Sequence, residues 1–173
     1  YIRGNKNDYD NWVKLGCDGW SYKEVLPIFK KLENDQTGGD PNYHSIGGEW
    51  PVVKPQDANI ILQRFIKAGA KLDLPHNQDF NGSSQLGLGI YNVNQHKGER
   101  VNSYRAFVKP IIARPNLTIY KNTKVNTIEI DGEIATSVNI QTNGIEKKIT
   151  CLKEVILSAG AIESPRLLMA SGI

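Results

Sequence analysis

The stretch "SAGAIESPRLLMASGI", residues 158–173, decides the fold. It completes an apolar run, residues 154–160, whose lack of alternation predicts a strand buried on both faces in a parallel sheet. Gly160 permits a sharp turn, and Ser164 followed by Pro165 predicts a helix with Ser164 as its N-cap. We therefore expect a strand, a turn and a helix in succession, which is the repeating unit of an α/β fold.

The turn at Gly160 is a candidate ligand site. Ligands of open α/β sheets lie at the carboxyl ends of the strands, and the free N–H groups of a helix start favour an anion or a polar ligand edge. An ordinary tight connection with a good cap has the same local features. The physical features alone therefore leave both interpretations open.

Three helices are predicted before this stretch. The S-x-x-E motif at residues 21–24 is a capping box that starts a helix over residues 21–34, in which an internal proline predicts a kink or a short first piece. Apolar residues at helical spacing predict an amphipathic helix over residues 57–74. A third helix is expected over residues 102–111, and a short strand near residues 49–53.

The character of the sequence changes after residue 116. Three β-rich runs follow, at residues 117–131, 134–142 and 147–160. Asp-Gly and Asn-Gly pairs separate them, and both pairs are typical of hairpin turns. The runs predict a β-meander that leads into the buried strand, so the fold class is α/β or α+β.

Composition excludes several classes of partner. The net charge is +3, from 21 basic and 18 acidic residues, and it is too mild and too evenly spread for nucleic acid. The longest apolar run falls far short of the ~20 residues that a membrane span requires. Cys17 and Cys151 fit no metal or redox spacing. We expect two buried free thiols, with a disulfide as the alternative.

The last 14 residues resemble the second signature of the glucose–methanol–choline (GMC) flavin oxidoreductases. The fixed positions of that pattern are filled by Gly160, Ala161, Ser164, Pro165, Leu167, Leu168, Ser171, Gly172 and Ile173. The pattern expects one more glycine, at position 174. On this resemblance we expect the chain to be an internal fragment of a longer enzyme.

Three further stretches resemble the same family. They are "YIRGNKNDYDNW" with the helix that follows it, "YHSIGGEWPV", and "GERVNSYRAFVKPIIARPNLTI", which is close to the insect glucose-dehydrogenase-like branch apart from Asn102, where Ser or Thr is more usual. The resemblance implies part of a Rossmann-like FAD-binding domain with a β-meander, in residues 1–45 and 113–173. It implies part of a substrate-binding domain and connecting elements in residues 46–112.

The resemblance also implies a cofactor and a reaction. Family members bind FAD and move hydride from the CH–OH group of an alcohol or sugar to the flavin, and the final electron acceptor stays open. The implied cofactor-binding residues are Val125, through its backbone at the adenine, and a loop beside the ribose and pyrophosphate: Ser158, Ala159, Gly160 and Ala161. The segment from Tyr1 to Asn5 aligns with the tail of a flavin loop, and we interpret it as structural.

No catalytic residue is expected in this chain. The family's catalytic histidine belongs to a C-terminal segment, and the dinucleotide fingerprint G-x-G-x-x-G is not present either. We interpret His44, His76 and His96 as surface imidazoles in polar segments, and no spacing indicates a metal site. We expect the chain alone neither to hold FAD tightly nor to turn over.

Two other functions remain open. A non-catalytic family member acting as a binding or structural module would share these motifs, and so would a hydroxynitrile lyase on the same scaffold. Asn81-Gly82-Ser83 and Asn116-Leu117-Thr118 are glycosylation sequons, which have meaning only in a secreted protein and favour that location only slightly.

Overall fold

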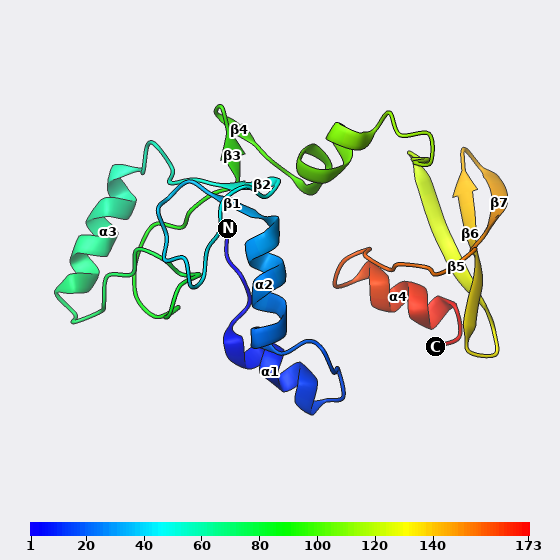
Figure 1. Cartoon of the computed structure of the whole chain (residues 1–173), viewed down its shortest axis with the longest axis horizontal. Helices are drawn as coiled ribbons and strands as arrows, with labels where there is room; N and C mark the ends of the chain where they lie inside the picture. Colours follow the sequence, from blue (N-terminus) through cyan, green and yellow to red (C-terminus); the bar gives the residue numbers. More distant parts are fainter. The chain divides into compact units, whose positions relative to one another are not determined.

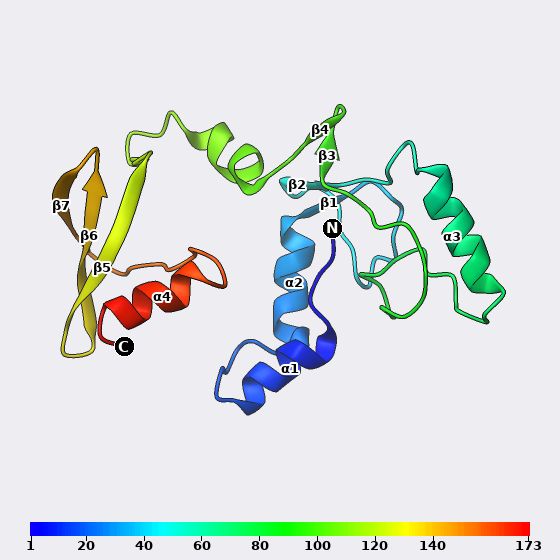
Figure 2. The same cartoon turned by 180° about the vertical axis from the view of Figure 1, so that it is seen from behind.

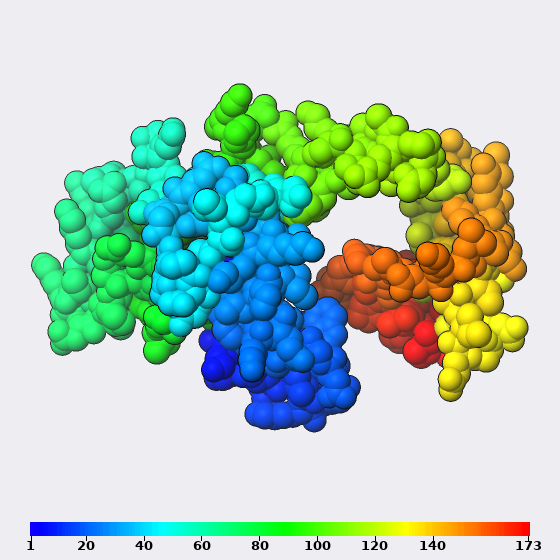
Figure 3. Space-filling model, in the orientation of Figure 1, coloured from blue at the N-terminus to red at the C-terminus, as the bar shows by residue number.

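The computed structural model describes all 173 residues of the chain. They form two compact units, Tyr1–Arg114 and Pro115–Ile173, and each is described by itself (Figure 1). In the space-filling view of Figure 3, the blue, cyan and green parts of the first unit pack against one another. None of the helices has both the length and the apolar character needed to cross a membrane. The predicted assignment of segments to an FAD domain and a substrate domain stays a prediction.

The first unit contains three helices, two short pairs of strands and two irregular helical turns. In chain order these are α1 (Lys6–Lys14), α2 (Tyr22–Leu32), β1 (Glu33–Asp35), β2 (Trp50–Val52), α3 (Ile60–Ala70), β3 (Gln95–His96), β4 (Glu99–Arg100), a π-helical turn (Tyr104–Val108) and a 3₁₀ turn (Lys109–Ile111). The strands pair as β1 with β2 and as β3 with β4. The amino terminus lies beside β1 in both views (Figures 1 and 2).

The start of α2 confirms the predicted capping box. Ser21 is the N-cap, and its N–H donates to the Glu24 carboxylate at 3.0 Å. The helix runs through Pro27 without interruption, so the predicted short first piece is wrong. Packing explains the continuity, because the same helix buries Val25 and sets Phe29 edge-on against Tyr9 of α1, with ring centroids 5.9 Å apart.

The strand pair β1–β2 organises the first unit. β2 confirms the strand expected near residues 49–53, and it pairs in parallel with β1, which the sequence did not predict. The residues of β1, Glu-Asn-Asp, have low strand propensity, so only their tertiary pairing makes them a strand. Because alternate residues of a strand point to the same face, Glu33 and Asp35 share one face of β1, and both are buried.

α3 has the predicted helical form with an exposed apolar face. Asn59 caps it through a hydrogen bond from the Ile61 N–H, at 2.8 Å. Ile61 and Phe65, two of the apolar positions that predicted the helix, are 69% and 61% exposed. Only Gly69 is buried on this helix. The periodicity therefore predicted the helix correctly, while the face that it defines finds no cover within the chain.

The third predicted helix is irregular. Residues 102–111 were expected to form one helix, and the structure divides this region into the π-helical turn and the 3₁₀ turn given above. Pro110 lies inside the 3₁₀ turn, and the helical backbone ends at Ile111. Proline lacks an N–H and cannot continue an α-helical ladder, which is consistent with a change of helical type at this point.

The second unit is a β-meander with one helix. β5 (Thr123–Asp131), β6 (Ile134–Thr142) and β7 (Ile145–Thr150) form an antiparallel sheet in the order β5-β6-β7, and α4 (Glu163–Ala170) packs against β5 (Figures 1 and 2). The predicted hairpin turns are both confirmed. Asn143 and Gly144 have φ values of 51° and 80°, as a two-residue turn with two left-handed positions requires.

The predicted buried strand over residues 154–160 is wrong for this chain. The segment has no regular secondary structure, and Ile156 is 78% exposed. A strand needs a neighbour to accept and donate its backbone hydrogen bonds, and no strand of the second unit pairs with this segment. The apolar run is therefore present without the parallel sheet that its composition predicted.

Both cysteines are free thiols, as the sequence favoured over a disulfide. Their expected burial is wrong, since Cys17 is exposed and Cys151 is half-buried. Cys17 follows the end of α1, in a turn where Gly16 takes a φ of 97°. Neither cysteine belongs to the sites described below.

Candidate functional site

A pocket in the second unit contains three of the predicted cofactor residues. Its volume is about 440 Å³, and it lies between β5, the segment 155–159 and α4. Val125, Ser158 and Ala159 all line it, although Val125 is more than 30 positions away in the sequence. Its other lining residues are Thr123, Lys124, Ile128, Val138, Val155, Ile156, Leu157, Glu163, Arg166 and Leu167. The other two predicted residues, Gly160 and Ala161, follow directly in the chain and do not line the pocket.

The turn after the pocket depends on Gly160. Its φ of 98° lies in the left-handed region, which favours glycine. A Cβ placed at this position would meet no atom within 4 Å, so the requirement for glycine here comes from the backbone conformation and not from a close contact. The sequence correctly predicted a sharp turn at this residue.

The predicted role of Ser164 as N-cap is wrong. α4 begins at Glu163, and Ile162 occupies the cap position, so Ser164 lies inside the first helical turn. There its hydroxyl accepts a hydrogen bond from the Ala159 N–H at 3.0 Å, and its own N–H donates to the Gly160 carbonyl at 3.0 Å. Ser164 therefore fixes the shape of the loop that borders the pocket.

The far end of α4 is joined to β5 by Ser171. Its hydroxyl oxygen accepts a hydrogen bond from the Ile128 N–H at 2.8 Å and donates to the Leu167 carbonyl at 2.6 Å. β5 is an edge strand, so an N–H on its outer side has no ladder partner. Leu167 is buried between the helix and the sheet. The sequence identifies Ser171 only as a signature position, because its partner Ile128 is 43 residues away.

The charge around this pocket is nearly balanced. Arg166 pairs with Glu163 at 2.6 Å within the first turns of α4. Lys124 adds one cation on β5. The remaining wall consists mainly of aliphatic side chains, including Val125 and Leu167. Such a lining suits a flat, largely uncharged ring system better than a multiply charged group.

The pocket fits the adenosine part of a dinucleotide. Ligand sites usually occupy roughly 300–1,000 Å³ and combine apolar walls with a few polar groups. Here the aliphatic walls flank the space, and the outer edge of β5 supplies backbone groups that have no strand beside them. The residues present are therefore suitable for holding this part of FAD.

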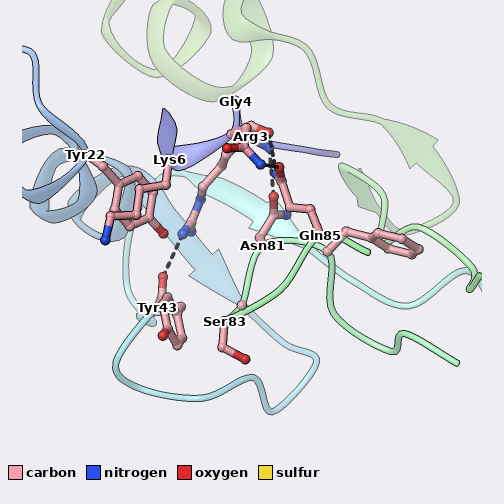
Figure 4. Close-up of a pocket in the computed structure, with 11 residues that line it drawn as sticks. Arg3, Gly4, Lys6, Tyr22, Tyr43, Asn81, Ser83 and Gln85 are labelled. Atoms are coloured by element: carbon pink, nitrogen blue, oxygen red, sulfur yellow. Dashed lines mark hydrogen bonds between the residues drawn. The ribbon is translucent and has the colours of Figure 1, made fainter. Parts of the chain in front are cut away.

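A second pocket, in the first unit, has a volume of about 210 Å³. Figure 4 shows Tyr22, Lys6, Tyr43, Asn81 and Ser83 around Arg3. The full lining is Arg3, Gly4, Asn5, Lys6, Tyr22, Tyr43, Phe80, Asn81, Gly82, Ser83 and Gln85. The segment after Tyr1, interpreted from the sequence as structural, therefore forms one wall of a polar pocket.

Arg3 borders this pocket, but its side chain is buried and makes hydrogen bonds in several directions. Its guanidinium donates to the Glu33 carboxylate at 2.7 Å. The guanidinium also donates to the Tyr43 carbonyl at 2.7 Å, and the backbone N–H of Arg3 donates to the Asn81 side-chain oxygen at 2.7 Å (Figure 4). Its guanidinium also lies 5.5 Å from the centroid of the Phe29 ring. Arg3 thus joins the amino-terminal segment to β1 and to two loops.

His44 is buried, so its predicted exposure is wrong. Its Nδ1 lies 3.0 Å from a Glu33 oxygen, and its Nε2 lies 2.9 Å from an Asp79 oxygen. Carboxylates at both nitrogens favour the doubly protonated ring. The hydrogen bond with Glu33 raises the pKa of His44 above its usual value, although burial acts in the opposite direction. His76 and His96 are exposed, as predicted.

Two carboxylates and one imidazole of this region lie close enough together to suggest a metal centre. They are Glu33, Asp35 and His44, all buried. Their ligand atoms are already engaged, because Glu33 binds Arg3 and His44, while Asp35 accepts from the N–H groups of Thr37 and Gly39 at 3.1 and 2.9 Å. We therefore interpret the cluster as a buried ion network that stabilises the first unit.

Known proteins that resemble the chain share its whole length. The family model described as GMC oxidoreductase matches residues 1–173. An alcohol dehydrogenase [acceptor] of Pseudomonas putida is 40% identical over 175 residues, covering 100% of this chain and 32% of the relative. An oxygen-dependent choline dehydrogenase of Brucella anthropi is 35% identical over 173 residues, covering 100% of this chain and 31% of the relative.

Solved structures agree with these relatives. The crystal structure of pyridoxine 4-oxidase from Mesorbium loti is 34% identical, with a TM-score of 0.88, and the match covers 100% of this chain and 34% of that one. The chain spans about a third of the length of these relatives. It has the predicted mixed fold, which is that of the FAD-binding domain of such enzymes. The chain belongs to the GMC oxidoreductase family.

Proposed function

We propose that this chain supplies the adenosine side of the FAD site in an oxidoreductase that acts on the CH–OH group of a small alcohol. The observation that carries the proposal is the pocket beside β5, where Val125, Ser158 and Ala159 come together from distant parts of the sequence. The names of the relatives support the substrate class, since they specify an alcohol, choline and pyridoxine, each of which carries a hydroxyl group.

The residues of this chain hold and orient the cofactor. Bound FAD would supply the acceptor for the hydride of the alcohol C–H bond. The aliphatic side chains of Val125 and Leu167 would flank the ring system of the adenosine part, and the loop shaped by Ser164 would close the pocket on one side. Arg166 and Glu163 neutralise each other, so they leave the pocket without a strong net field.

No residue of this chain is assigned to proton abstraction. A general base must reach the substrate proton with a free acceptor atom. His44 is buried, and both of its ring nitrogens already contact carboxylates. His76 and His96 are exposed, and we assign neither of them to the reaction. The proposed reaction therefore relies on a base that this chain does not provide.

A substitution that fills the pocket tests the proposal in the full-length protein. Ala159→Phe places a ring in the space assigned to adenosine, and we expect it to lower the FAD content of the purified protein at least tenfold. Ala170→Phe adds the same ring to an exposed position of α4 outside the pocket, and it should leave FAD content unchanged. Equal FAD content in the two variants would overturn the proposal.

Anaerobic mixing with an alcohol tests the reaction itself. Loss of the yellow flavin absorbance on adding choline, pyridoxine or a simple primary alcohol is the expected result. A hydroxynitrile lyase would cleave its substrate with the flavin still oxidised, and a non-catalytic module would show neither change. The relatives' names differ in the electron acceptor that they specify, so reoxidation should be followed with oxygen and with an artificial acceptor in parallel.

A further inference from the structure

The two glycosylation sequons of the chain lie in different structural settings. Asn81-Gly82-Ser83 belongs to the first unit and Asn116-Leu117-Thr118 to the second. The sequence alone does not distinguish the two sites, because each has the N-x-S/T pattern. We propose that, of the two sequons, only Asn116 can carry an N-glycan in the folded molecule and that Asn81 cannot.

The side chain of Asn81 is already part of the fold. It is only 5% exposed, its side-chain oxygen accepts from the Arg3 N–H at 2.7 Å, and its amide nitrogen lies 3.4 Å from the Tyr1 carbonyl. Its backbone N–H donates to Asp79 at 2.9 Å. A glycan would replace one amide hydrogen and place a bulky group in this buried position, so a chain modified at Asn81 would lose these contacts.

The residue after Asn81 leaves no additional room. A Cβ placed on Gly82 would come within 2.7 Å of an Asp79 carboxylate oxygen. Asp79 is in turn held by His44 at 2.9 Å. The first sugar of a glycan at Asn81 would have to break the contacts of its side chain with the Arg3 N–H and the Tyr1 carbonyl.

The setting of Asn116 is open. Asn116 and Thr118 are both exposed, and Asn116 lies in a turn that precedes the first strand of the meander. The structure shows this segment as a loop before β5 (Figure 1). Asn116 is not among the residues that line the pocket beside β5, so a glycan there leaves the candidate cofactor site free.

The modification is a simple group transfer. The bond that forms joins the side-chain nitrogen of Asn116 to C1 of the first sugar. The bond that breaks joins the same C1 to the pyrophosphate of a lipid-linked oligosaccharide donor, and the amide nitrogen gives up one proton. No oxidant or reductant takes part, and the chain needs only to present the amide and the Thr118 hydroxyl together.

Two matched substitutions remove one sequon each and keep both asparagines. The full-length protein is secreted from a eukaryotic host, and its glycan is located by mass spectrometry before and after enzymatic release. Thr118→Ala should abolish the glycan, while Ser83→Ala should leave it unchanged. A glycan on Asn81 in the secreted, folded protein, or no glycan on either asparagine of the unmodified sequence, would overturn the proposal.

Discussion

The guanidinium of Arg3 and the carboxylate of Glu33 lie 2.7 Å apart, with side chains that are 2% and 0% exposed. A buried charge without a partner is strongly unfavourable, so the pair holds the amino-terminal segment against the start of β1. His44 extends the pair to Asp79, and the four charges balance when His44 is protonated. The network thereby connects four segments of the first unit: the amino-terminal segment, β1, and the two loops that contain His44 and Asp79.

Removing Arg3 should destabilise the first unit severely. Arg3→Met keeps much of the aliphatic volume and leaves Glu33 with one cation fewer, and we expect a loss of about 3–5 kcal/mol in the free energy of unfolding. Arg105→Met is the matched control, because it breaks an exposed pair with Glu99 and should cost less than about 1 kcal/mol. Urea unfolding followed by tryptophan fluorescence compares the two. A similar loss in both variants would contradict the importance given to burial.

The stability of the first unit should depend on the protonation of His44. Its pKa is raised in the folded state, chiefly by the hydrogen bond with Glu33 and further by Asp79. The contribution is therefore fully present below the unfolded pKa, near 6.5, and is lost as pH rises through the higher folded value. Urea midpoints measured from mildly acidic to alkaline pH should fall over that window. His44→Gln should remove this part of the slope, and an identical slope in the variant would refute the assignment.

Elements specified by neighbouring residues were predictable from the sequence. The capping box at Ser21 and Glu24 started α2 as expected, and Asn143-Gly144 formed the expected hairpin turn. The GMC signature also begins in the loop beside the β5 pocket. In each case the information lies within a few residues, so distant contacts are not needed to interpret it.

Features that depend on distant partners were not predictable. His44 looked like a surface imidazole because its partners, Glu33 and Asp79, lie 11 and 35 residues away. Glu33 and Asn34 of β1 were predicted as the end of the helix over residues 21–34, because these polar residues become a strand only by pairing with β2. The opposite error occurs at residues 154–160. Their composition predicts a strand, but no strand of the chain pairs with them.

Ser171 should be required for α4 to stay on β5. Ser171→Ala leaves the Ile128 N–H without its acceptor, and we expect a cost of about 1–3 kcal/mol together with weaker FAD retention. Ser171→Thr keeps the hydroxyl and should recover much of the stability. Thermal unfolding and FAD content are the two measurements. Full stability of the alanine variant would show that the edge of β5 finds another partner.

Two adjacent glycines, in "SIGGEW", should respond differently to alanine. Gly47 has a φ of 89° in open space, so Gly47→Ala meets only backbone strain, which costs about 1–2 kcal/mol. Gly48 donates its N–H to the Glu33 carbonyl at 3.0 Å, and a Cβ there would lie 2.3 Å from the Leu32 carbonyl oxygen. Because backbone atoms cannot move aside cheaply, Gly48→Ala should separate this loop from β1 and disturb the position of Glu33. We expect a larger loss of stability for Gly48→Ala, and also a weaker pH dependence, since the His44–Glu33 contact is disturbed. Equal effects of the two substitutions, measured by urea unfolding at two pH values, would contradict the close approach of this loop to β1.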